Sequence, residues 1–112
     1  MRSHKITMYA EKIYELEEIK RALKDGLNEK QILNTELKGE VIREIGEART
    51  MMLVFDRYLV MHKESVSLSI LLTEYRGYQG ADIILAGHRG IVTDDSFSDS
   101  VAKTLLQLGF QS

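Results

Sequence analysis

Cysteine is missing from this chain of 112 residues. Its absence excludes disulfide bonds, thiolate metal ligands and cysteine nucleophiles, and a protein without disulfides needs no oxidising compartment. Long apolar runs are missing as well, because charged residues interrupt every apolar stretch before it reaches bilayer length, and the first residues lack the apolar core of a secretion signal. We therefore expect a cytoplasmic protein that does not associate with a membrane.

The common sequence signatures of catalysis and cofactor binding are missing too. The chain has neither glycine-rich phosphate-binding motif, no Gly-x-Ser-x-Gly elbow and no His-x-x-x-His pair. Nucleotide chemistry, a serine nucleophile and a metal site built on His4, His62 and His88 therefore have no support. We expect no cofactor, no metal and no catalytic residue.

The charge balance argues against nucleic acid as a partner. With a net charge of -2 and a pI near 5.9, the chain has no general attraction to phosphates, which basic side chains would have to neutralise. Lys20, Arg21 and Lys24 have helical spacing, but acidic residues interleave with them. Such mixed charge is typical of a solvated helix face.

The composition indicates one globular domain. Hydrophobic residues make up 44% of the chain and charged residues 29%, which is enough apolar material to offset the chain entropy lost on folding. The length suits a single core, so we expect one domain over residues 1–112. Because proline is absent, element boundaries have to be inferred from glycines and polar clusters.

The first half of the chain predicts a short strand, a helix and a segment of ambiguous type. The strand is expected over His4–Met8. Apolar residues then recur every three to four positions from Ile13 to Leu23, which predicts a helix, and Gly26 is expected to end it in a left-handed cap. From Leu33 to Ile45 a four-residue period fits helix and strand alike, and we assign a strand.

The second half predicts further strands. Thr50–His62 is rich in apolar residues at both odd and even positions, as in a strand buried on two faces at the centre of a sheet. Val66–Thr73 alternates with a period of two, and a polar hairpin joins it to the strand before. A turn over Arg76–Gly80 then precedes a short strand over Ala81–Ala86.

The last segment predicts a C-terminal helix, because an apolar stripe runs from Phe97 to Leu108 just ahead of Gly109. Asp94 and Asp95 offer capping oxygens at its start. The expected fold class is therefore α+β: a mainly antiparallel sheet of four or five strands with an early helix and a C-terminal helix, in the order β-α-β-β-β-β-α.

Four stretches of the second half form a recognisable set: Val54–Tyr58, Val66–Ser69, the glycine-rich turn Gly77–Ala81 and the ending Phe97–Phe110. With them, the chain from about Phe55 to Phe110 resembles a family of small bacterial proteins known as a domain of unknown function. The resemblance implies a sheet with an early helix and a terminal helix. It brings no activity with it.

Two glycine-rich loops are candidate binding sites. In Gly87-His88-Arg89-Gly90, the glycines allow the backbone to approach a ligand, while His88 and Arg89 offer donors to a phosphate or carboxylate. An ordinary surface loop explains the same residues and is favoured, as is a tight turn for Gly77–Gly80. A small-molecule or anion-binding domain that uses the Gly87–Gly90 loop is the alternative function, with its ligand unidentified.

Three methionines of the apolar strand, Met51, Met52 and Met61, raise the question of what covers the sheet. If the first helix and the segment from Leu33 to Ile45 covered opposite faces, these residues would be core. If helices covered only one face, the other would expose an apolar patch that a second copy would bury. We favour the second arrangement. The expected function is a non-enzymatic interaction or accessory domain that forms a homodimer through a sheet face around Met52, Val54, Tyr58 and Val60.

Overall fold

The computed structural model describes residues 2–29, 35–59, 63–87 and 96–112. Within these ranges the chain forms five strands and two helices. Their bounds are β1 Arg2–Glu11, α1 Leu16–Glu29, β2 Thr35–Ile45, β3 Ala48–Leu59, β4 Glu64–Tyr75, β5 Tyr78–Gly87 and α2 Ser96–Gln107. The predicted α+β class and the predicted order of elements are confirmed, with a sheet of five strands.

The strands form one antiparallel sheet in the order β1-β5-β4-β3-β2. Strands β2 to β5 follow one another as hairpins, whereas β1 lies beside β5 at the far edge. Because β1 adds to the β5 side, the central strand is β4. The prediction that the strand beginning near Thr50 occupies the centre was therefore wrong, since β3 lies one place nearer the β2 edge.

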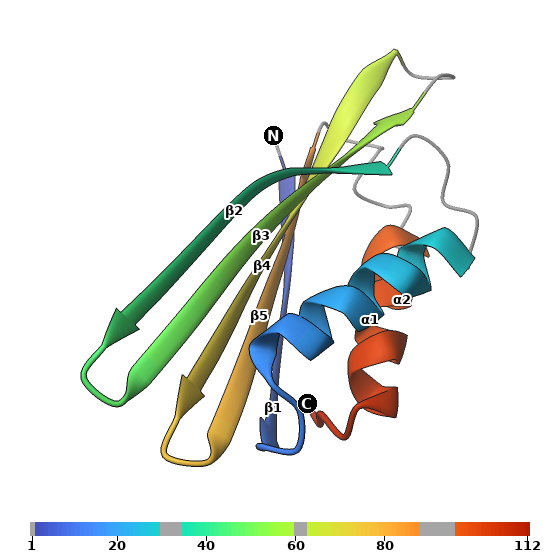
Figure 1. Ribbon diagram of the computed structural model, residues 1–112. Helices are drawn as coiled ribbons and strands as arrows, with labels where there is room; N and C mark the ends of the chain where they lie inside the picture. The colour runs from blue at the N-terminus through green and yellow to red at the C-terminus, as the bar shows by residue number, and fades with distance from the viewer. Residues whose placement is uncertain (1, 30–34, 60–62, 88–95) are drawn as a thin grey trace.

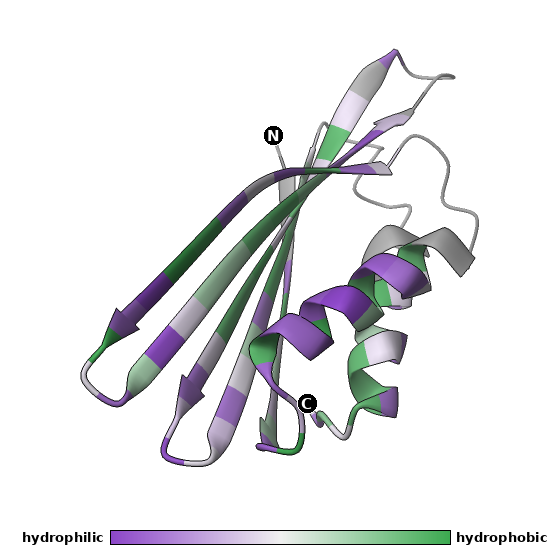
Figure 2. Cartoon of the chain, viewed as in Figure 1, coloured by the Kyte–Doolittle hydropathy of each residue, from purple (hydrophilic) through white to green (hydrophobic). Residues whose placement is uncertain are grey.

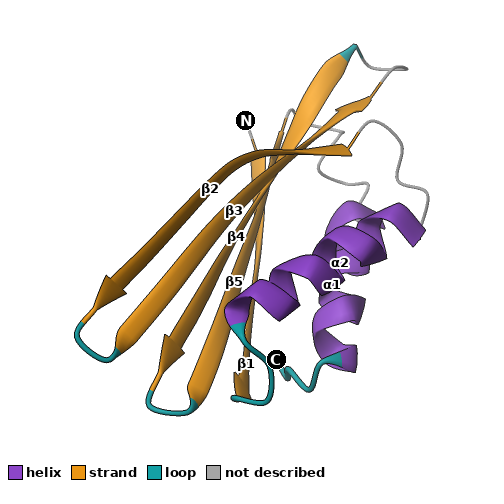
Figure 3. Ribbon diagram, in the orientation of Figure 1, coloured by secondary structure: helices purple, strands orange, loops and turns teal. Residues whose placement is uncertain are grey.

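Both helices lie on the same side of the sheet (Figures 1 and 3). We call the side that they cover the inner face. Alternate residues of the strands point into the space between sheet and helices, where they are buried, as a period of two requires. The inward-facing strand residues with the least exposure are Met51, Leu53, Leu68, Ile70, Leu72, Ala81, Ile83 and Leu85.

Helix α1 packs on the sheet through the predicted stripe, and Leu16, Ile19 and Leu23 are fully buried. The side of α1 that faces the viewer in Figure 2 is largely hydrophilic. The helix begins after Ile13, which is exposed, and it continues past Gly26 to Glu29, so the predicted end at Gly26 was wrong. Gly26 does not have the positive φ angle of a cap. The absence of a side chain at this position is explained instead by a close contact with α2.

Helix α2 and the chain end confirm the predicted C-terminal helix. Val101 and Leu105 are buried against the core, and Gly109 ends the helix with a φ angle of +96°. The Phe110 amide donates to the Leu105 carbonyl at 3.0 Å, and the Phe110 ring is buried. Gln111 then pairs with Tyr9 through two backbone hydrogen bonds of 2.8 Å, so the end of the chain covers part of the free edge of β1.

Strand β2 confirms the assignment of the ambiguous segment over Thr35–Ile45, while residues 33 and 34 lie outside the described residues. A β-bulge interrupts the pairing with β3 between Leu37 and Gly39. Leu37 opposes Phe55 on the inner face, but after the bulge Val41 opposes Met52 on the other face. Apolar residues that are four positions apart in β2 therefore lie on opposite faces of the sheet on the two sides of the bulge.

The turn between β4 and β5 is shorter than predicted. Arg76 and Gly77 both have positive φ angles, 49° and 81°, which is the geometry of a tight two-residue hairpin turn. Strand β5 begins directly afterwards at Tyr78, earlier than the predicted start at Ala81, because Tyr78 and Gln79 pair with both neighbouring strands.

Neither α1 nor α2, the two helices of the described ranges, is long and apolar enough to cross a bilayer. The cytoplasmic location inferred from the sequence stays a prediction.

Candidate functional site

The face of the sheet turned away from both helices is the candidate site, and we call it the open face. No described element lies over it (Figure 1). Its side chains form rows across the sheet, because the strands are paired in register. The middle row contains Thr7, Asp82, Leu71, Met52 and Val41, and the adjacent row contains Lys5, Ile84, Ser69, Val54 and Gly39.

The middle of the open face is apolar. Val41 is 49% exposed, Ile84 42% and Met52 40%. Val54 and Leu71 are half-buried between them. We call these five residues the open-face patch. Large apolar side chains that are partly exposed and contiguous are typical of interaction surfaces.

Strand β3 shows most clearly how the two faces differ. Met51 and Leu53 point to the inner face and have no exposed surface, whereas Met52 lies between them and points outward. The middle of β3 is hydrophobic on both parities (Figure 2). The expectation that this strand is buried on two faces was therefore wrong for the single chain, because both helices cover the same face.

Tyrosines lie toward the two ends of the open face. Tyr58 is at one end, opposite Ser65 of β4. Tyr75 and Tyr78 oppose each other at the other end, where the Arg76 guanidinium lies 5.2 Å from the centre of the Tyr75 ring. All three side chains are exposed, by about half for Tyr58 and Tyr75 and by more for Tyr78. Aromatic side chains are common anchors of protein interfaces, because they bury much area at little cost in entropy.

Charged residues also differ between the two ends. Near Tyr58, the side chains of Glu36, Lys38, Asp56, Tyr58 and Ser65 line a hollow of about 250 Å³. Lys38 Nζ lies 2.6 Å from Glu36 Oε2, and this contact lowers the pKa of Glu36 and raises that of Lys38. Arg43 lies toward the opposite end of β2, where it opposes Thr50.

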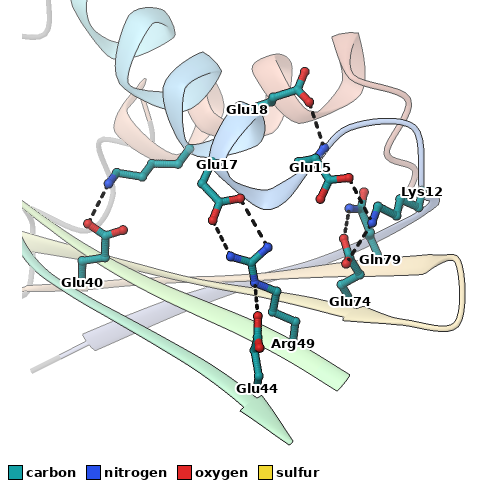
Figure 4. A network of polar contacts seen from close by, with 10 residues as sticks. Lys12, Glu15, Glu17, Glu18, Glu40, Glu44, Arg49, Glu74 and Gln79 are labelled. Atoms are coloured by element: carbon teal, nitrogen blue, oxygen red, sulfur yellow. Dashed lines mark hydrogen bonds and ion pairs between the residues drawn. The ribbon is translucent and has the colours of Figure 1, made fainter. Parts of the chain in front are cut away.

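The inner face carries a polar network at the start of α1 (Figure 4). The Arg49 guanidinium donates to both carboxylate oxygens of Glu17, and its Nε lies 3.2 Å from Glu44 Oε1. The Glu17 carboxylate accepts hydrogen bonds from its own backbone amide, the larger effect, and from Arg49, and both lower the pKa of Glu17. The pair ties the first turn of α1 to β3, and Glu44 extends it to β2.

The same network reaches β4 and β5. Lys12 Nζ lies 3.1 Å from Glu74 Oε2, and the hydrogen bond raises the pKa of Lys12. Gln79 is buried and donates through Nε2 to the Tyr14 carbonyl at 2.8 Å and to Glu74 Oε1 at 3.0 Å. Further along α1, Lys20 pairs with Glu40 of β2 at 2.7 Å. These groups attach α1 to the sheet.

A metal site in the described ranges would need several histidine or acidic side chains to converge. No group of three or more histidine or acidic side chains there is placed to hold a metal ion. His62 and His88 lie outside these ranges.

The structure brings together three of the four predicted interface residues. Met52, Val54 and Tyr58 share the open face of β3, while Val60 lies outside the described residues. Sequence reasoning missed the contributions of the neighbouring strands, Val41, Leu71 and Ile84. For Leu71 and Ile84 a signal existed, since each is an apolar residue at a position where alternation would place a polar one.

The predicted loop site stays a prediction. Gly87 is the last residue of β5, where it is buried and pairs with Arg2. His88, Arg89 and Gly90 lie outside the described residues. Of the second glycine-rich stretch, Gly77 lies in the tight turn Arg76–Gly77, whereas Tyr78–Gly80 belong to β5.

Residues 5–109 match the model of DUF6054, a family of unknown function. The chain belongs to this family. The match confirms the predicted membership in an uncharacterised family, and it covers far more of the chain than the stretch from Phe55 to Phe110 on which the resemblance rested. No activity is assigned to DUF6054, so membership in the family does not indicate a function.

A search of the curated proteins found no match. Among solved structures, the chain aligns with the solution structure of the 18 kDa protein CC1736 from Caulobacter crescentus, a structural genomics target. The two proteins are 9% identical, the alignment covers 96% of this chain and 90% of that chain, and the TM-score is 0.30. Similarity at this level carries no argument about fold or function.

Proposed function

We propose that this member of DUF6054 is a non-enzymatic interaction domain that forms a homodimer through the open face of its sheet. One observation carries the proposal: both helices cover the inner face, which leaves the open-face patch on the surface of the single chain. Burial of exposed apolar area is the main driving force of association. A second copy offers an identical patch, so one contact would cover both.

The size of the open face fits a stable dimer. Strands of 10 to 12 residues, at about 3.3 Å per residue and about 4.8 Å between neighbours, make the five-stranded face roughly 35 Å by 24 Å. The product, roughly 800 Å², matches the area of about 800 Å² that each partner contributes to a stable interface of standard size.

The edges of the sheet favour contact through the face. Strand β2 carries the charged residues Glu36, Lys38, Glu40, Arg43 and Glu44 and contains the bulge, and both features discourage a foreign strand from pairing. At the other edge, Gln111 already occupies the hydrogen-bonding groups of Tyr9. Edge-to-edge pairing is therefore disfavoured along β2 and at Tyr9 of β1.

Native mass spectrometry tests the proposal, because one spectrum reports the number of subunits and any small molecule that the protein retains. We expect a dimer without added mass. Met52→Glu, which places a carboxylate in the middle of the patch, should raise the dissociation constant of the dimer at least about tenfold. Leu106→Glu is the matched control, because Leu106 is an exposed apolar residue of α2 and should leave the dimer intact.

Far-UV circular dichroism would establish that both variants are folded. A wild-type monomer at micromolar concentration would contradict the proposal, and a monomer with added mass would favour ligand binding instead. Equal weakening by Met52→Glu and Leu106→Glu would also contradict it, because the contact would then not depend on the open face.

A further inference from the structure

Charge is unevenly distributed along the open face. Arg43 lies toward the hairpin that joins β2 to β3, and it makes no ion pair with the other described residues. Glu36 and Asp56 oppose each other at the other end of the β2–β3 pairing. Lys38 lies against Glu36 and also feels the charge of Asp56. Two carboxylates and one ammonium therefore lie together at this end of the β2–β3 pairing.

The acidic end is also hollowed. The hollow of about 250 Å³ is lined by two carboxylates, a lysine, a tyrosine and a serine: Glu36, Asp56, Lys38, Tyr58 and Ser65. A guanidinium group suits such a site, because its planar N–H donors match carboxylates and its face stacks on an aromatic ring. Arg43 is a cation of this kind, and it has no ionic partner among the residues that the structure describes.

Two identical faces can stack about a two-fold axis that lies between them, either along the strands or across them. An axis along the strands makes β2 face β1 and β5 face β3 of the second copy. Arg43 would then face Tyr9 of that copy and Glu36 would face Ser3, because each pair of residues belongs to the same row. Neither charged side chain would meet an opposite charge, so this orientation is disfavoured.

An axis across the strands makes each strand face its own copy in the reverse direction. On β3, Thr50 is the residue paired with Arg43, and Asp56 is the residue paired with Glu36. The midpoint of these rows falls at Leu53, between Met52 and Val54. An axis at this midpoint places Met52 opposite Val54 of the second copy, apolar against apolar. It also places Asp82 opposite Ile84 of the second copy, with Lys5, the β1 partner of Ile84, diagonally opposite Asp82.

We infer that the two copies stack with antiparallel strands, and that Arg43 of each copy occupies the hollow beside Glu36 and Asp56 of the other. The inference rests on the proposed dimer and adds its orientation and its polar contacts. Two such contacts form in each dimer, because the axis relates them. The apolar middle supplies affinity, while the charged ends select the direction of stacking.

Complementary charge reversal tests this orientation. Arg43→Glu brings like charges together at both contacts of its homodimer, and so does Glu36→Lys. Each variant alone should form a homodimer about tenfold weaker than the wild type. In a mixture of the two, the mixed dimer has opposite charges at both contacts. The introduced glutamate faces the introduced lysine at one contact, and the native Arg43 faces the native Glu36 at the other. Native mass spectrometry of such a mixture, with one variant labelled with ¹⁵N, should therefore show mixed dimers well above the statistical half.

Arg21→Glu mixed with Asp25→Lys is the control, because both residues are exposed on α1, on the other side of the sheet. This pair should mix statistically. A wild-type dimer whose Arg43 and Glu36 variants also mix statistically would overturn the inferred orientation and leave the proposed dimer standing. A wild-type chain that stays monomeric would instead contradict the proposed function itself.

Discussion

At the scale of single residues, glycine has different roles at three positions of this chain. Gly77 and Gly109 adopt positive φ angles, one in a hairpin turn and one at the end of α2. Gly26 lies inside α1, where a β-carbon would be only 2.4 Å from Thr104 Oγ1 of α2. The absence of a side chain at Gly26 therefore allows the two helices to approach each other closely.

Gly26→Ala should destabilise the protein by about 1–3 kcal/mol, although alanine is the better helix former. The Thr104 hydroxyl cannot turn away freely, because it donates to the Ser100 carbonyl at 3.0 Å. Urea denaturation of the wild type and the variant would measure the change in the free energy of unfolding.

The double variant provides the control. In a Thr104→Ala background the clash is removed, so Gly26→Ala should become neutral or stabilise the chain by up to about 1 kcal/mol through helix propensity. A loss of equal size in both backgrounds would show that the contact with Thr104 is not the cause.

At the scale of elements, the hairpin between β4 and β5 separates two glycines that look alike in the sequence. Gly77 has a φ angle of +81° in the turn, whereas Gly80 is an extended residue of β5. A β-carbon on Gly80 would meet only the Met8 carbonyl oxygen at 3.9 Å, an ordinary contact. The turn therefore depends on the first glycine and not on the second.

We expect Gly77→Ala to cost about 1–2 kcal/mol, because an L-residue with a β-carbon is strained in the left-handed region. Gly80→Ala is the matched variant in the same hairpin, and it should stay within about 0.5 kcal/mol of the wild type. Thermal unfolding followed by circular dichroism would compare them, and a larger effect for Gly80 would contradict the assignment of the turn to Arg76–Gly77.

In strand β2, the strand type follows from the sequence but the bulge does not. Its strand type could be inferred from Thr35, Val41 and Ile42, but the bulge between Leu37 and Gly39 could not, because it depends on the pairing with β3. The bulge moves Val41 from the inner face to the open face. A residue that the regular alternation assigns to the core thus becomes part of the candidate site.

At the scale of the whole molecule, stability and association should be linked. A chain that dimerises when folded and not when unfolded gains stability with concentration, because mass action favours the folded dimer. The melting temperature of the wild type should therefore rise by several degrees when the protein concentration increases a hundredfold. Differential scanning calorimetry over that range would measure the shift.

Met52→Glu should reduce this concentration dependence, since a weaker dimer leaves more of the chain monomeric, and a monomer unfolds without dissociation. A wild-type melting temperature that is constant with concentration would contradict the dimer at this scale, independently of any mass spectrum.

The sequence by itself determined the class of fold, the order of the elements and most of the core. Alternation in Val66–Thr73, the stripe of α1 and the stripe of α2 are local patterns, and burial follows them directly. The neighbours of each element were decided only by the tertiary structure. It set β1 beside β5, both helices on one face and Thr104 against Gly26, because these contacts join residues far apart in the chain that no local period can relate. The open face is a result of the same kind: its apolar residues can be read from the sequence, but only the position of both helices on the other face leaves them uncovered.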